Sequence, residues 1–343
     1  MKVLFIRFSS IGDIVLTTPV VRCLKQQVPD AEVHYLTKAN FKSVLEGNKY
    51  VDKLHWLDKT NFIELIATLR GEEYDYILDL HHNLRSLRFK QKIRVGKTKV
   101  FSFPKLNMQK WLLTNLKINM MPDKSLVERY FETVRPLGVK NDGQGLDYQL
   151  PESVQVTNKD IPMSHWAGYV ACVIGGSYFT KRLPVEQWQK LCEIVPYPLM
   201  LLGGPEDREA GEIIAAQDPI KIYNACGKFS VNESAALVGF SKVVVSNDTG
   251  LMHVGAAYKK PVISLWGNTS PEMGMFPYYG YNNVKGNISP LTIMLEKKDL
   301  KCHPCSKIGY DKCPKGHFRC MRELDMAFVC EKILEFWGKT PTK

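Results

Sequence analysis

The sequence lacks any apolar run long enough to cross a membrane. A membrane-spanning helix needs about 18 or more apolar residues, whereas the longest apolar stretches of this chain are Tyr169 to Ile174 and the proline-broken run from Ile194 to Leu202. The N-terminus reaches Arg7 after only four apolar residues, so it lacks the apolar core of a secretory signal. We therefore predict a protein that stays in the cytoplasm and does not cross a bilayer.

Acidic residues are missing from one long stretch. The whole chain carries 46 Lys and Arg against 35 Asp and Glu, a formal charge of +11. From His81 to Met120 there are ten Lys or Arg residues and no Asp or Glu. A surface of this kind attracts anionic partners through its summed field, and nucleic acid, anionic lipid head groups and phosphorylated glycolipid all fit. A solvated basic face without a partner is the alternative.

The cysteines do not form an even set of the kind that a disulfide framework needs. Of nine cysteines, four are dispersed along the chain and favour reduced thiols: Cys23, Cys172, Cys192 and Cys226. The other five lie after residue 300, and four of them have a spacing with zinc-ligand character: Cys302, Cys305, Cys313 and Cys320. A structural metal and reduced packing thiols are both consistent with this spacing. We predict no catalytic metal and no cofactor.

The 343 residues are about twice a typical domain, so two cores are expected. Short β-branched strands alternate with helical stretches from Lys2 onward, the pattern breaks between Pro136 and Trp166, and it restarts at Tyr169. Such alternation predicts two successive open α/β domains with parallel sheets. In these sheets, ligands bind beyond the carboxyl ends of the strands.

No P-loop and no G-x-G-x-x-G motif is present, which argues against kinases and nicotinamide enzymes. Four other loops follow predicted strands: Ser9 to Asp13, Gly175 to Lys181, Gly203 to Asp207, and Ser246 to His253. These four loops are the candidate sites.

The loop from Ser246 to His253 leads into a helix, whose free N–H groups suit a phosphate. Thr249 adds a hydroxyl, and Gly250 permits close approach. Asp248 suits sugar hydroxyls, with a helix cap as the alternative. His253 would lie near Thr249 on the helix, or would simply pack there.

The other two loops of the second domain carry complementary groups. Ser177 and Lys181 suit a diphosphate, because lysine supplies a point charge beside small residues. Glu206 could bind a ribose diol or act only as a first-turn acid of a helix. In the first domain, Asp13 is either a helix cap or a general base at the mouth of the site.

Together these motifs resemble glycosyltransferase family 9, the ADP-heptose:lipopolysaccharide heptosyltransferases, over nearly the full length. The matching segments are Ile6 to Asp13 with Pro19, Asp79 to Ser86, Gly176 to Pro184, Gly203 to Pro205, and Asp248 to His253. The resemblance implies a GT-B fold of two Rossmann-like domains that face each other across a cleft. It places an acceptor-binding domain at 1–155 and a nucleotide-sugar domain at 156–323, with a final helix, 324–338, packed back on the first. The lysine loop departs from the family pattern, because Leu183 stands where the family often has Trp.

The resemblance also implies an inverting transfer from ADP-L-glycero-D-manno-heptose to a lipopolysaccharide core acceptor, with Asp13 as the base. The implied donor residues are Ser177, Lys181, Glu206, Asp248, Thr249, Gly250 and His253. For an anionic, lipid-linked oligosaccharide acceptor at the cytoplasmic face of the inner membrane, we expect Ser10, Arg85 and Arg88 to provide contacts.

Two other functions remain open at this point. One is a GT-B enzyme that uses a UDP-sugar, including a UDP-sugar epimerase. The other is a non-catalytic protein whose basic segment binds nucleic acid, although aromatic residues are sparse there and no RNA-recognition or helix-turn-helix signature is present. We predict no nucleic-acid partner.

Overall fold

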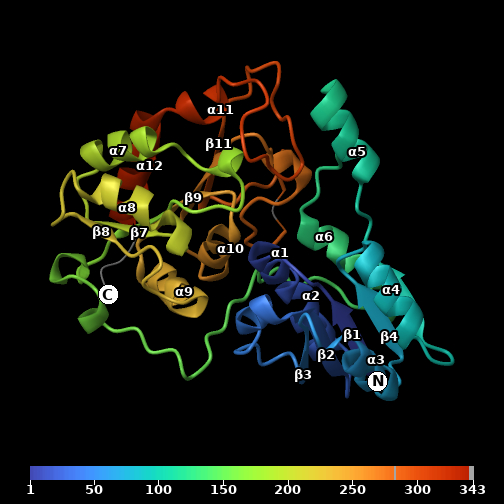
Figure 1. Cartoon of the computed structure of the whole chain (residues 1–343). Helices are drawn as coiled ribbons and strands as arrows, with labels where there is room; N and C mark the ends of the chain where they lie inside the picture. Colours follow the sequence, from blue (N-terminus) through green and yellow to red (C-terminus); the bar gives the residue numbers. More distant parts are fainter. Residues whose placement is uncertain (282, 340–343) are drawn as a thin grey trace. The chain divides into compact units, whose positions relative to one another are not determined.

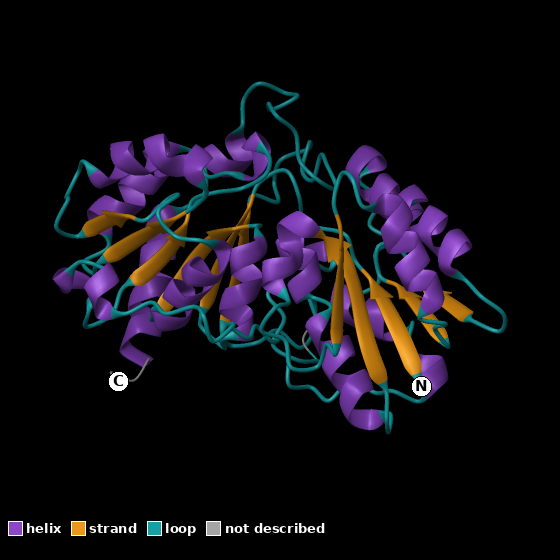
Figure 2. Cartoon of the chain, turned by 60° about the horizontal axis from the view of Figure 1, so that its bottom comes forward, coloured by secondary structure: helices purple, strands orange, loops and turns teal. Residues whose placement is uncertain are grey.

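The computed structural model describes residues 1–281 and 283–339 and divides into two compact units. Unit 1 contains 1–105, 124–153 and 278–281. Unit 2 contains 106–123, 154–277 and the described residues of the C-terminal segment, 283–339. Each unit is a parallel sheet with helices on both faces (Figure 2), which confirms the predicted α/β class.

Unit 1 has a five-stranded sheet in the order β3-β2-β1-β4-β5, with all four strand pairings parallel. Its strands are β1 (Lys2–Ile6), β2 (Glu32–Lys38), β3 (Lys53–Leu57), β4 (Tyr76–Asp79) and β5 (Lys99–Ser102). Its helices are α1 (Ile11–Val15), α2 (Thr18–Gln27), α3 (Phe62–Gly71), α4 (Leu84–Ile93) and α6 (Leu126–Phe131), with short 3-10 helices η1 (Ala39–Val44) and η3 (Arg135–Leu137). Strand order reverses between β1 and β4, so the switch point lies there.

Unit 2 has a six-stranded parallel sheet in the order β11-β10-β9-β6-β7-β8. Its strands are β6 (Val170–Val173), β7 (Leu199–Leu202), β8 (Ile222–Asn224), β9 (Val243–Asn247), β10 (Val262–Trp266) and β11 (Thr292–Glu296). Its α-helices are α5 (Asn107–Trp111), α7 (Val185–Ile194), α8 (Arg208–Ala215), α9 (Val231–Phe240), α10 (Gly250–Ala257), α11 (Arg319–Arg322) and α12 (Met326–Lys339). A π-helical turn, η2 (Leu112–Leu116), continues α5, and the 3-10 helices are η4 (Asn158–Asp160), η5 (Met163–His165), η6 (Phe179–Lys181), η7 (Pro205–Asp207) and η8 (Pro271–Met273). The switch point of this sheet lies between β6 and β9.

Two edge strands, β5 and β11, are absent from the sequence interpretation. Both are mostly half-buried, whereas the central strands β6 and β9 are fully buried apolar runs. An edge strand contacts fewer neighbours and keeps polar residues such as Lys99, so its apolar signal is weak.

The first helix is also divided. A single helical stretch from Ile14 to Gln27 is expected from periodicity, but the structure has α1 ending at Val15 and α2 beginning at Thr18, with Pro19 in its first turn. Proline lacks an N–H group and is tolerated only at the start of a helix, so it separates the two.

The connection after residue 136 stays with unit 1 as far as Ser153. Buried Arg22 on α2 accounts for this attachment, because its guanidinium donates to Asp142 at 2.8 Å and to the carbonyl of Gly145 at 2.9 Å. The segment is therefore anchored to unit 1 rather than a free linker.

The last helix differs from the expectation for 324–338. The structure assigns α12 to unit 2, where it packs against α7 (Figure 1). Val329, Ile333 and Phe336 are buried in the apolar core that also contains Leu191 of α7. Burial of this apolar face explains why α12 groups with unit 2 and not with the first domain.

Within the described part of the chain, no helix combines the length and apolarity that a membrane span requires.

Candidate active site

The switch point of unit 1 holds a largely enclosed ion pair. Arg7 follows β1, and its Nη2 lies 2.7 Å from Oδ1 of Asp13 on α1, with side-chain exposures of 10% and 15%. The same guanidinium donates to the carbonyls of Ser9 at 2.7 Å and Leu80 at 2.5 Å. Arg7 is thus fixed from three sides, and it fixes one oxygen of the Asp13 carboxylate.

Ser10 holds the other oxygen of this carboxylate. Oδ2 of Asp13 accepts from the backbone N–H of Ser10 at 3.1 Å and from its hydroxyl at 2.9 Å. Burial raises the pKa of Asp13, but the charge of Arg7 and the bonds from Ser10 outweigh it and hold the pKa below its usual range. The N-cap of α1 is Ser10, so Asp13 is not itself the cap. Asp13 is therefore an ionised carboxylate that also bonds back to the residue capping its helix.

The end of β4 completes this side of the site. Asp79 accepts from the N–H groups of His81 and His82 at 3.0 and 2.7 Å, and its buried carboxylate pairs with Lys90 at 2.6 Å. Burial and the nearby Arg7 lower the pKa of His81 to about 4, so this imidazole is neutral at pH 7. Asp79 therefore fixes the turn into α4 and does not face a ligand.

The predicted acceptor residues lie on exposed positions of unit 1. Ser10 is exposed beside Asp13, and Arg85 on α4 places its guanidinium 6.0 Å from the ring of Phe8. Arg88, one turn further on, lines a hollow of about 340 Å³ together with Arg85, Leu57 and Phe62. The structure thus brings Ser10 and Arg85 to the Asp13 end of the sheet, and it places Arg88 further along the helix.

The basic segment contributes residues to both units. Lys90 is buried against Asp79, and the segment divides between unit 1, up to Lys105, and unit 2, from Leu106 onward. One of the ten cations of the run, Lys90, is therefore paired inside unit 1 and does not face a partner.

A second ion pair marks the switch point of unit 2. Nζ of Lys181, in η6 after β6, lies 2.5 Å from Oδ2 of Asp248, which follows β9. Their side chains are 16% and 7% exposed. The hydroxyl of Thr269 also donates to Oδ2 of Asp248, at 3.1 Å. The two residues, which the sequence analysis assigns to different loops, meet at this edge.

The remaining donor candidates of this loop lie at the start of α10. Thr249 is the N-cap of the helix and Gly250 its first residue, so Asp248 is not the cap. His253 is only 1% exposed, which agrees with the packing alternative for this residue. Thr249 and Gly250 are half-buried and leave the helix start partly accessible.

Ser177 and Glu206 lie on the two loops beside Lys181. Both are exposed, in the loops after β6 and β7, and these two strands are hydrogen-bonded neighbours. Their side chains are therefore available to a ligand at the carboxyl edge of the sheet.

Three residues position these loops but are not among the site residues predicted from the sequence: Asn247, Arg182 and Asp207. Asn247 at the end of β9 donates to the carbonyls of Ile174 and Gly175 and accepts from the N–H of Leu183. Arg182 lies 3.3 Å from buried Asp207 and donates to the carbonyl of Gly176. An asparagine after a strand was visible in the sequence, but its partners, more than sixty positions away, were not.

Steric crowding by the neighbouring loop explains why residue 175 is a glycine. A Cβ built on Gly175 would lie 2.5 Å from Oδ2 of Asp207, which is too close for any side chain. This close approach lets the loops after β6 and β7 pack together.

The cysteine-rich segment supports the same loops. The N–H groups of Cys305 and Ser306 donate to the carbonyl of Asn268 after β10, and Thr180 exchanges backbone and hydroxyl bonds with Tyr310. His303 lies 2.9 Å from the carbonyl of Gly267. The segment therefore braces the loop that contains Lys181.

A metal at these cysteines stays a prediction. Sγ of Cys302 lies 3.6 Å from Nε2 of His317, but no three ligand atoms of this set converge to metal spacing among the residues described. Burial raises the pKa of Cys320 to about 12, so its thiol is protonated without a metal. Elemental analysis of purified protein, never exposed to chelator, tests the prediction.

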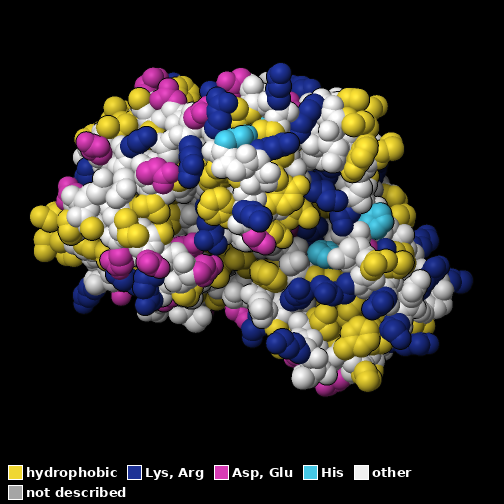
Figure 3. Space-filling model, turned by 45° about the horizontal axis from the view of Figure 1, so that its top comes forward, with side chains coloured by type: hydrophobic (Ala, Val, Ile, Leu, Met, Phe, Trp, Pro, Cys, Tyr) yellow, Lys and Arg dark blue, Asp and Glu magenta, His cyan; other side chains and the backbone are white. Residues whose placement is uncertain are grey.

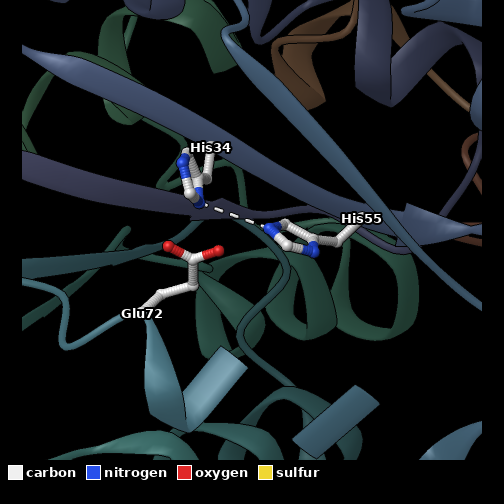
Figure 4. A group of neighbouring side chains, drawn as sticks. All are labelled: His34, His55 and Glu72. Atoms are coloured by element: carbon white, nitrogen blue, oxygen red, sulfur yellow. Dashed lines mark hydrogen bonds between the residues drawn. The ribbon is translucent and has the colours of Figure 1, made fainter. Parts of the chain in front are cut away.

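A titratable cluster lies at the opposite, amino end of the unit 1 sheet (Figure 4). His34 Nδ1 lies 3.2 Å from His55 Nε2 and 2.8 Å from the hydroxyl of Tyr74, while His34 Nε2 meets Glu32 at 2.8 Å. The hydrogen bonds from Lys2 and Lys53 lower the pKa of Glu72 to about 2. Two ammonium groups on one carboxylate oppose a cation, so this cluster is a hydrogen-bonded network of the fold.

Two parallel α/β units, each with candidate site residues at its switch point, are the architecture of the GT-B fold. A solved glycosyltransferase family 9 structure from Veillonella parvula matches with a TM-score of 0.75 and 21% identity, over 99% of this chain and 98% of that one. An Escherichia coli ADP-heptose lipopolysaccharide heptosyltransferase II structure matches with a TM-score of 0.70 and 19% identity, over 99% of each chain. These likenesses establish the fold.

Sequence comparison gives the family. The model of glycosyltransferase family 9 (heptosyltransferase) matches residues 62–303, and the chain belongs to this family. Lipopolysaccharide heptosyltransferase 1 of Campylobacter coli is 25% identical over 303 residues, covering 78% of this chain and 84% of that protein. The protein is thus a glycosyltransferase.

Proposed function

We propose that this protein transfers heptose from ADP-L-glycero-D-manno-heptose to a lipopolysaccharide core acceptor, with inversion at the anomeric carbon. Membership of the heptosyltransferase family and the names of its relatives support the substrates. The observation that carries the chemistry is an ionised, rigidly held Asp13 at one switch point and the Lys181–Asp248 pair at the other. The donor would bind within 156–323 and the acceptor within 1–155.

On the donor side, Lys181 would leave Asp248 and bind the diphosphate. Asp248 repels phosphate but accepts hydrogen bonds from sugar hydroxyls. The N–H groups at the start of α10, with Thr249 and Gly250, would hold the phosphates alongside the loop with Ser177. Glu206 would accept from the ribose hydroxyls, and buried His253 would position the helix from within. The negative charge that develops on departing ADP is then met by fixed donors and one ammonium.

On the acceptor side, Asp13 would take the proton of the attacking hydroxyl. As that oxygen bonds to the anomeric carbon, the bond from this carbon to the diphosphate breaks and ADP leaves with the electron pair. A single displacement inverts the configuration. Ser10, Arg85 and Arg88 would contact an anionic, lipid-linked acceptor at the cytoplasmic face of the inner membrane.

A thermal-shift panel tests the nucleotide. ADP should raise the melting temperature more than UDP or GDP at equal concentration, because a ligand that binds only the native state stabilises it by mass action. A larger shift with UDP would favour the UDP-sugar alternative. Salt-sensitive binding of unrelated DNA and RNA, without transfer from any nucleotide sugar, would favour the nucleic-acid alternative.

A further inference from the structure

Unit 2 carries one helical segment with a markedly apolar exposed side, residues 106–120, which we call the α5 segment. Helix α5 runs directly into η2, so residues 107–116 form one continuous helical stretch (Figure 1). Five large apolar side chains on the segment are at least half exposed: Met108, Trp111, Leu116, Ile118 and Met120. Figure 3 shows hydrophobic side chains gathered at the upper right of that view, where α5 lies in Figure 1.

The opposite side of the segment is anchored to unit 2. Leu106 and Leu113 pack with Met121 and Met273 in a small apolar cluster. Nζ of Lys117 donates to the carbonyls of Cys302 and Pro304 at 3.0 and 2.6 Å. Met108, Trp111 and Leu116 therefore belong to a helical stretch anchored to unit 2, and Ile118 and Met120 lie in the non-helical chain that directly follows it.

The charge of the α5 segment indicates which kind of partner its exposed side would bind. Lys110 and Lys117 give the segment a positive charge, and residues 106–120 include no Asp or Glu, although the ammonium of Lys117 is held on the side anchored to unit 2. A positively charged segment with exposed Trp and Met matches the chemistry of an anionic bilayer surface, where apolar groups enter the boundary region and a positive field attracts the phosphates. A second copy of the chain would instead place like charges together.

We propose that the α5 segment docks on an anionic lipid bilayer, with Met108, Trp111 and Met120 inserted at the boundary between head groups and acyl chains. Docking would hold the enzyme beside a lipid-linked acceptor, and this role rests on the proposed function. Lipid binding can be measured without transfer, so an experiment can contradict the docking proposal and the proposed function independently.

Quenching of tryptophan fluorescence by acyl-brominated phosphatidylglycerol vesicles tests insertion. Quenching is expected for the parent and for Trp166→Phe, a matched control because Trp166 is also about half exposed in unit 2. It should be lost in Trp111→Phe. Equal quenching of Trp111→Phe and the parent would overturn the proposal.

Cosedimentation with phosphatidylglycerol vesicles tests the whole surface. The triple variant Met108→Gln/Trp111→Gln/Met120→Gln should partition at least about tenfold less than the parent. The control Met163→Gln/Ile220→Gln/Phe240→Gln removes three other exposed apolar groups of unit 2 and should bind as the parent does. Melting temperatures of all variants are compared, and the single Trp111→Phe result stands if the triple variant unfolds.

Three outcomes contradict docking on anionic lipid. They are equal binding of parent and triple variant, equal binding of the parent to phosphatidylcholine vesicles, and a lipid-free dimer that the triple substitution converts to monomer. Transfer to a soluble, deacylated acceptor should be unchanged in the triple variant, whereas transfer to vesicle-bound acceptor should fall. Absence of transfer in every protein, with lipid binding intact, would refute only the proposed function.

Discussion

The two switch points carry ion pairs of similar burial but different construction. In unit 1 the cation is Arg7, whose guanidinium is bound to two carbonyls as well as to Asp13. In unit 2 the cation is Lys181, and within the described residues its ammonium has only Asp248 as a partner. A planar, multiply bonded arginine holds its carboxylate in place, whereas a lysine on a flexible stem can change partners. The difference suits a fixed carboxylate base at one site and a movable positive charge for a leaving group at the other.

The largest effect is expected from Asp13→Asn. Asparagine keeps an oxygen that can accept from Ser10 but cannot take a proton, so transfer should fall about 10²- to 10⁴-fold. ADP affinity, measured by calorimetry, should be unchanged. Because Arg7 loses its charged partner, the free energy of unfolding should also fall, so rates are compared well below the melting temperature.

Asp142→Asn is the matched control for Asp13. It removes a carboxylate from another buried arginine of unit 1, Arg22, outside the switch point. Stability should fall while the transfer rate stays near the parental value. If Asp13→Asn transfers at more than about half the parental rate, its pair with Arg7 is structural only.

Acid should weaken unit 1 through buried histidines. Burial lowers the pKa of His55 to about 4, while the unfolded value is about 6.5. The unfolded state therefore binds the extra proton, and stability that is complete above about pH 6.5 is lost as the pH falls toward 4. The loss is at most about 3 kcal/mol for His55.

Denaturant unfolding at several pH values measures this loss. His55→Gln should flatten the slope between pH 6.5 and 4, and His81→Gln at the other end of the sheet should do the same. An unchanged slope in both variants would show that protonation of these two histidines does not cause the loss. The carboxylate of Asp13 acts in the same direction, because its pKa is also lowered in the folded state: the stability from its pair with Arg7 is present above the unfolded pKa and is lost as the pH falls through the folded pKa.

Lys181→Ala should weaken ADP binding by about 1.5 to 3 kcal/mol, through the loss of a charge-assisted contact. Lys190→Ala, on α7 of the same unit, is the control and should bind ADP normally. Calorimetry that gives equal ADP affinity for Lys181→Ala and the parent would show that this lysine does not reach the diphosphate. Because Lys181→Ala leaves the buried carboxylate of Asp248 without its cation, the melting temperature should also fall, and ADP affinities are compared well below it.

The smallest effect is expected at the acceptor. Arg85→Gln/Arg88→Gln/Lys92→Gln removes three exposed cations of α4 and should raise the acceptor KM several-fold, at about 0.3 kcal/mol for each exposed contact. ADP affinity should not change. Lys97→Gln, also exposed and basic, serves as the control, and an acceptor KM that responds equally to both variants would assign the effect to net charge alone.

Much of the fold and part of the site could be predicted from local sequence. The fully buried strands β6 and β9 are apolar from Val170 to Val173 and from Val243 to Val245, and the glycine and hydroxyl residues that follow these runs mark the carboxyl ends where ligands bind. The half-exposed strands β5 and β11 lack that signal. The placement of α12 also could not be predicted, because an amphipathic pattern shows that a helix buries one face but not which neighbour covers it.

The sequence by itself determined the residue types at the two switch points, since Asp13 and Lys181 follow strands in short loops whose chemistry is local. The tertiary structure alone decided the pairing of Lys181 with Asp248, the burial of Lys90 against Asp79, and the bracing of the lysine loop by the cysteine-rich segment. It also decided that the α5 segment joins unit 2 with an apolar side exposed. Such contacts join residues far apart in the chain, and they depend on which sheets and helices pack together, a property that no local pattern encodes.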